Sequence, residues 1–163
     1  MNMNTIALTL LMYASLGQTP PPAPQNRQRE VDERGAHAMG FDQERTTHHF
    51  LLYDDGGAVD ILVKDAGDAA NRDAIRAHLP HIAALFAQGR FDLPHFIHAT
   101  DVPGTADMTR LKDRLTYSYT ATELGGRLDI VTTDAAALAA VHRFLTFQIE
   151  DHGTGDSMVV RKR

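Results

Sequence analysis

Histidine is the residue type of this chain best suited to chemistry. The sequence has nine histidines and no cysteine. A thiolate zinc site, a disulfide and a CxxCH haem attachment all require cysteine and are therefore excluded for this sequence. Imidazole nitrogens bind copper and zinc, and they act as acids or bases near neutral pH. A metal ion would therefore be held by histidine, carboxylate or thioether groups.

The stretch Asp68–Gly89 predicts a helix that carries His78 and His81 on either side of Pro80. At 100° per residue His78 falls within the apolar arc, and His81 falls at its edge. Pro80 removes one backbone hydrogen bond and crowds the preceding turn, so we expect a kink or a break at His78 and Leu79. The helix therefore predicts one inward histidine close to a distortion.

An internal repeat predicts the fold class. GGAVDILVKD at residues 56–65 and GGRLDIVTTD at residues 125–134 share a glycine pair, an Asp-Ile step and a closing aspartate before an alanine-rich segment. Each copy is typical of a hairpin followed by a helix. We predict an α+β fold of two ββα units, with a four-stranded antiparallel sheet and two helices on one face.

The register of the two expected hairpins places further side chains inside. A two-residue turn at Asp55-Gly56 or Gly56-Gly57 puts His48 on the apolar, helix-covered face with Val59 and Ile61. An equivalent turn at Gly125-Gly126 directs Tyr117 and Tyr119 inward.

The second helix of the repeat predicts two more inward histidines. Asp134 is a suitable N-cap for a helix over Ala135–Asp151, which Gly153 would end. His142 and His152 both fall on the apolar arc of that helix.

Four histidines are therefore expected on one interior, and they are the main candidates for a metal site: His48, His78, His142 and His152. Secondary candidates lie at the helix edge, in the connecting stretch 90–114, which we expect to be irregular, and in the GAHAM segment: His81, His98, His37 and Met39.

The function favoured by this pattern is binding of a transition metal ion, copper or zinc, through inward histidines. Three alternatives remain open. One is noncovalent haem binding through an inward histidine, and another is a metal-free acid/base enzyme that uses buried histidines with Tyr117 or Tyr119 and Asp129. The third is a structural or partner-binding module, with an outward Leu51, Tyr53 and Leu62 patch that supports a homodimer.

Other features narrow these classes. No GxSxG, P-loop or GxGxxG motif is present, which favours a binding protein over an enzyme. The net charge of −5 and pI near 5.9 disfavour nucleic acid as a partner. A length of 163 residues suits a single compact domain with a tail.

The amino end predicts export. Residues 1–17 are typical of a signal peptide, with an apolar run that is too short to span a bilayer and small residues before Gln18. We expect a periplasmic or secreted protein without a stable membrane span after processing. The expected organisation is a Pro-rich extended linker at 18–34, one domain at 35–157 and a basic tail at 158–163.

Three segments also carry a family resemblance. MGFDQERTTHHF at 39–50, HLPHI at 78–82 and FLTFQIEDHGTGD at 144–156 resemble a family of small exported bacterial proteins, over roughly Gly35 to Asp156. Members are sometimes called aspartate carbamoyltransferases. This chain lacks the Ser-Thr-Arg-Thr phosphate loop of that enzyme and is too short for its two α/β domains. The resemblance supports the domain limits and export, and it implies no mechanism.

Overall fold

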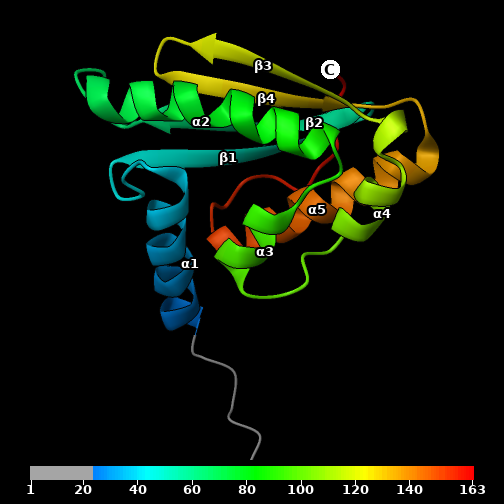
Figure 1. Ribbon diagram of the computed structural model, residues 1–163, viewed down its shortest axis with the longest axis horizontal. Helices are drawn as coiled ribbons and strands as arrows, with labels where there is room; N and C mark the ends of the chain where they lie inside the picture. The colour runs from blue at the N-terminus through cyan, green and yellow to red at the C-terminus, as the bar shows by residue number, and fades with distance from the viewer. Residues whose placement is uncertain (1–23) are drawn as a thin grey trace, which may run out of the picture.

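The computed structural model describes residues 24–163, which form an α+β fold (Figure 1). The predicted signal peptide lies outside these residues. Two ββα-like units follow one another, as the repeat predicts. In chain order the elements are α1 (Pro24–Met39), β1 (Thr46–Tyr53), β2 (Gly56–Val63), α2 (Ala69–Ala87), α3 (Asp92–His98), α4 (Thr105–Arg110), η1 (Lys112–Arg114), β3 (Thr116–Thr122), β4 (Gly125–Val131) and α5 (Ala135–His152).

The sheet is antiparallel throughout, with the strand order β1-β2-β4-β3. At its centre Val59 pairs directly with Leu128, and these two residues hold the same place in the GGAVD and GGRLD copies. The outward Asp60 and Asp129 are also equivalent, and both bind Arg127, at 3.0 and 3.1 Å. The two units are therefore related by an approximate twofold axis at the centre of the sheet.

Helices α2 and α5 cover the same face of the sheet, but each lies over strands of the other unit. Helix α2 packs on β3 and β4, whereas α5 packs on β1 and β2. A Cβ atom on Gly57 would overlap Leu145 of α5, and one on Gly126 would lie 2.9 Å from Leu79 Cδ1 of α2. The glycine pairs therefore allow close helix-to-sheet packing.

The predicted positions of the two turns are wrong, because the glycine pairs lie within the strands and not in the turns. The glycine pairs begin β2 and β4, whereas the two-residue turns are Asp54-Asp55 and Glu123-Leu124. The shift leaves the alternation of faces unchanged, so His48 still pairs with Ile61 on the helix-covered side.

Both long helices begin at aspartate caps, as expected for α5. Asp68 accepts from the backbone of Asn71, and Asp134 accepts from the backbone of Ala136 and Ala137. Gly153 ends α5 in the left-handed conformation, with φ of 60°. The expected break in α2 does not occur, because the helix continues through the exposed Pro80 to Ala87.

Part of the predicted linker is helical, which corrects the expected extended conformation. Helix α1 begins at Pro24, a residue whose fixed φ suits the first turn of a helix. Val31 on this helix is fully buried, and Arg27 binds Asp151 of α5 at 3.0 Å. The prolines therefore precede or start a docked helix, which stands off the sheet beside α3 in Figure 1.

The stretch 90–114 is also more regular than expected, since it contains α3, α4 and η1. Asp92 and Pro94 lie in the first turn of α3 and favour a helix start, a signal that outweighs the irregular composition. In α3 the buried residues Pro94, Ile97 and His98 follow the i, i+3, i+4 pattern of one helical face.

The basic tail lies against the sheet. Arg161 pairs with Tyr53 beside the edge strand β1, and Arg163 forms ion pairs with Asp55 and Asp129. The Arg163 guanidinium also lies 4.5 Å from the centre of the Tyr53 ring. Tyr53 of the proposed outward patch is therefore partly covered by this chain itself. Among residues 24–163, no helix has the length and apolar character needed to cross a membrane.

Candidate functional site

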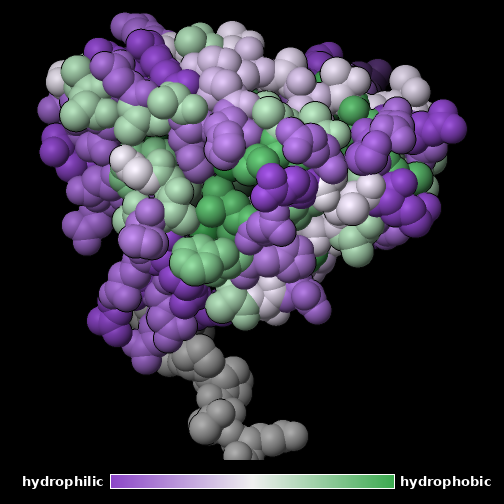
Figure 2. Space-filling view, viewed as in Figure 1, coloured by the Kyte–Doolittle hydropathy of each residue, from purple (hydrophilic) through white to green (hydrophobic). Residues whose placement is uncertain are grey.

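A cavity of about 70 Å³ lies between the sheet, α2, α5 and α3, and α1 contributes Met39 to its lining. Figure 2 shows apolar side chains gathered in a hollow on this side of the molecule, between α2 and α3. The lining consists of twelve apolar residues, one glutamine and four histidines, and the polar members are His48, His78, His98, Gln148 and His152. The cavity combines an apolar wall with an unusual concentration of imidazole groups.

His48 of β1 and His152 of α5 form the closest pair of candidate residues. Their rings stack with centres 5.6 Å apart and planes 9° apart. Burial, assisted by the charges of His78 and His49, lowers the pKa of His48 to about 4. Burial, followed by the charges of His48 and His98, lowers the pKa of His152 to about 3. Both rings are therefore neutral at pH 7, with a nitrogen lone pair free for bonding.

His48 also lacks a polar partner within the described part of the chain. Its Nε2 atom is buried and forms no hydrogen bond with residues 24–163. An unpaired buried polar atom destabilises a protein by roughly 1–3 kcal/mol. In a cavity wall such an atom can bond to a group that enters the cavity.

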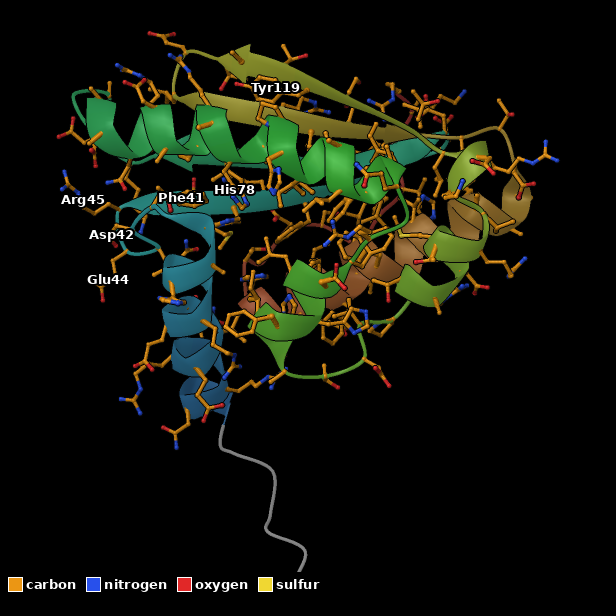
Figure 3. All side chains as sticks on the ribbon, in the orientation of Figure 1. Phe41, Asp42, Glu44, Arg45, His78 and Tyr119 are labelled. Carbon is orange, nitrogen blue, oxygen red and sulfur yellow. The ribbon has the colours of Figure 1, made fainter. Side chains whose placement is uncertain are left out.

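His78 lies on the same wall but is separated from the pair by a phenyl ring. Phe41 stacks on His48 with ring centres 6.0 Å apart, and it meets His78 edge-on at 5.6 Å. Figure 3 shows Phe41 and His78 side by side where the end of α1 meets β1 and α2. Burial, assisted by the charge of His81, lowers the pKa of His78 to about 4.

A second, polar cleft of about 270 Å³ meets the cavity at the His48 and His152 pair. Both histidines line both spaces, and Asp32, Lys64 and Thr47 are among the polar residues of the cleft. The pair therefore forms a boundary between a polar approach and an apolar interior. A hydrated ion could reach these two rings without crossing the apolar wall.

His98 belongs to a buried hydrogen-bond network that braces the same cavity. Its Nδ1 atom lies 2.6 Å from Asp151 Oδ2, and its Nε2 atom lies 3.0 Å from Gln148 Oε1. Burial raises the pKa of Asp151, but hydrogen bonds from Arg27 and His98 outweigh this effect and leave the pKa below its usual value. The ring of His98 meets that of His152 edge-on at 4.9 Å. His98 is held by two partners and positions His152.

His142, the fourth main candidate, is not brought to this cavity. Its Nε2 atom donates to the carbonyl oxygens of Tyr53 and Gly56, at 2.8 and 3.1 Å. These carbonyls flank the turn between β1 and β2, so His142 fastens α5 to the hairpin. Of the secondary candidates, His37 and His81 are exposed, whereas Met39 and His98 both line the cavity.

The groups proposed for acid/base chemistry do not meet. Tyr117 points inward, and burial raises the pKa of its hydroxyl, so this group stays protonated at neutral pH. Asp129 lies on the opposite face of the sheet, where Arg127 and Arg163 bind it. The sheet itself therefore separates the phenol from the carboxylate.

The geometry is not that of a fully formed metal site. Within residues 24–163, no three His, Asp or Glu side chains lie close enough together to hold one ion. A ring nitrogen lone pair lies in the plane of its ring, so the stacked His48 and His152 rings would have to turn to face a common ion. Comparison with family models, with curated proteins and with solved structures finds no match to this chain.

Sequence reasoning undervalued His98 and missed Gln148 and Asp151. The inward position of His98 could have been predicted from the Asp-x-Pro start of α3. A helix that begins there places Ile97 and His98 on its buried face. Gln148 lies beside the apolar arc of α5, one turn before His152. The bond between His98 and Asp151 joins residues 53 positions apart, and no local spacing indicates it.

Proposed function

We propose that the protein binds one transition metal ion, copper or zinc, between His48 and His152. The observation that carries the proposal is the neutral, stacked pair of imidazoles at the boundary between the polar cleft and the apolar cavity. Metal–nitrogen bonds of about 2.0–2.1 Å put ring centres roughly 3 Å from the ion. Two rings with centres 5.6 Å apart are therefore at a suitable separation.

Rotation of each ring about its Cβ–Cγ bond would aim the lone pairs at a common point. The unpaired Nε2 atom of His48 gains a partner in this arrangement, which offsets part of the energy needed for the rotation. His98 retains both of its hydrogen-bond partners and supports the ring of His152.

The size of the cavity favours an ion over a cofactor such as haem. Pockets that enclose drug-sized organic ligands measure roughly 300–1,000 Å³, compared with about 70 Å³ here. The fixed Nε2–H donation of His142 to two carbonyl oxygens assigns that residue a structural role.

The test is metal content followed by titration. The protein purified from its host is analysed for bound metals by mass spectrometry, and the metal-free chain is then titrated with copper and zinc. We expect saturation at one ion per chain, loss of binding in His48→Gln, and full binding in His81→Gln, which changes an exposed histidine of α2. Absence of saturable binding, or equal binding by both variants, contradicts the proposal.

We also propose that the chain is exported to the periplasm or beyond, on the strength of the leader sequence at residues 1–17. Intact-mass measurement of the protein from its host should show a new amino terminus near Gln18. Recovery of the protein with Met1 retained contradicts export.

A further inference from the structure

The histidine cavity contains a thioether in addition to its imidazoles. Met39, at the carboxyl end of α1, lines the cavity together with His48, His78 and His152. These four side chains come from four different elements, α1, β1, α2 and α5. Thioether sulfur is a soft ligand that binds monovalent copper, whereas it is a poor ligand for the harder divalent ions.

The charge of the lining also discriminates between ions. Its polar members are four histidines and one glutamine, and all other members are apolar. Asp151, the acid that contacts the histidine network, is already bound by Arg27 and His98. The desolvation free energy of an ion rises with the square of its charge, so a neutral wall of this kind accepts a monovalent ion more readily than a divalent one.

The number of available ligands also favours a monovalent copper ion over zinc. Structural zinc sites are almost always four-coordinate and tetrahedral. Here His98 is held by Asp151 and Gln148, and Phe41 lies between His78 and His48. The ligands nearest to convergence are the two rings of His48 and His152, with Met39 on the same lining. Monovalent copper is stable with two or three ligands of this type.

We propose that the ion bound at this site is Cu(I), held by His48, His152 and the sulfur of Met39. This inference rests on the proposed metal-binding function and specifies its metal. It gives α1 a functional role, because this helix both covers the site and supplies one ligand. Bound Cu(I) would therefore join α1 to β1 and α5.

The test is an anaerobic competition titration of the full chain against a colorimetric Cu(I) chelator, with a parallel titration against a colorimetric Zn(II) chelator. The informative variant is Met39→Leu, which conserves volume and removes the sulfur. The matched control is His37→Gln, an exposed residue on the same helix. X-ray absorption of the copper-loaded wild type independently reports whether a sulfur atom is bound.

We expect Cu(I) to bind at least a hundredfold more tightly than Zn(II). Met39→Leu should weaken Cu(I) binding at least tenfold and leave Zn(II) binding unchanged, and His37→Gln should match the wild type. A sulfur scatterer should be present in the wild type even if the variant fails to fold.

Zinc affinity equal to or above that of Cu(I), or a copper site without sulfur, overturns the assignment of Cu(I) while metal binding stands. Failure of both metals to bind overturns the proposed function itself.

Discussion

Helix α5 carries two histidines that the sequence places on the same face but that have different roles in the structure. His142 donates to two backbone carbonyls and closes the β1-β2 turn. His152, ten residues later, stacks on His48 at the boundary of the apolar cavity. The first is satisfied by its own chain, whereas the second faces a space that can accept a ligand.

The difference shows what helical periodicity does and does not report. A rise of 1.5 Å per residue separates His142 from His152 by about 15 Å along the axis of α5. A projection down that axis places the two residues about 80° apart on the same apolar arc, although no single ion could contact both. The expected cluster of four is therefore divided by distance along the helix, and His98 of α3 takes the place of His142 beside the cavity.

The largest expected effect is acid destabilisation of the metal-free protein by the cavity histidines. Burial lowers the pKa values of His48, His78 and His152 from about 6.5 to about 4, 4 and 3. Below pH 6.5 the unfolded chain binds protons that the folded chain excludes. The free energy of unfolding is therefore highest above pH 6.5 and falls as the pH drops toward 4, by on the order of 3 kcal/mol for each histidine.

Urea denaturation between pH 4 and pH 8 measures this dependence. His152→Leu should make the profile shallower, since only His48 and His78 then contribute, whereas His142→Leu should keep the wild-type slope because His48, His78 and His152 all remain. Identical slopes in the two variants would contradict the claim that His152 and His142 contribute differently to the pH dependence of stability.

Next in size is the loss of the carboxylate that braces the cavity end of the helix. Asp151→Asn keeps the shape of the side chain but weakens its bonds to Arg27 and His98. We expect a loss of about 2–3 kcal/mol in the free energy of unfolding, because the hydrogen bonds from Arg27 and His98 lose the charge of their acceptor. The adjacent change Glu150→Gln, at an exposed position, is the control. Equal stability of the two variants would show that the network is not important for the fold.

At the other end of α5, His142→Ala removes the donor to Tyr53 and Gly56. The expected loss in unfolding free energy is about 1–2 kcal/mol, the range for a hydrogen bond whose acceptors stay partly buried. Ala139→Ser, at an exposed position on the same helix, should have a much smaller effect. A variant as stable as the wild type would mean that this bond contributes little to closing the turn.

The sequence predicted the parts of the fold that depend on local pattern. The hairpin register, which pairs His48 with the apolar face of the second strand, determined which face of β1 carries His48, and Asp134 and Gly153 marked the limits of α5. The turn positions were wrong by one or two residues because Gly57 and Gly126 are needed for packing against Leu145 and Leu79. That requirement arises from tertiary contacts, which local spacing does not report.

The candidate site was less predictable for the same reason. His48, His78 and His152 were placed on the correct interior, but the division of His142 from His152 depends on the length of α5. The contribution of Met39 depends on the docking of α1, which the proline-rich start of the chain concealed. Arg27 and Asp151 join segments 124 residues apart, and only the folded chain brings them together.

The smallest expected effect is at His81, one turn along α2 from His78. This side chain is exposed, so His81→Gln should change the free energy of unfolding by no more than about 0.5 kcal/mol and leave the metal titration unchanged. A loss of binding in this variant would move the site from the cavity to the surface of α2.

The most direct test of the account makes the same substitution at the two ends of one helix. His142→Gln and His152→Gln are each titrated with copper and zinc, beside the wild type, and folding is verified by circular dichroism. We predict one ion per chain in the wild type and in His142→Gln, and no saturable binding in His152→Gln. Loss of binding in His142→Gln together with full binding in His152→Gln would contradict the assignment of the site to the cavity.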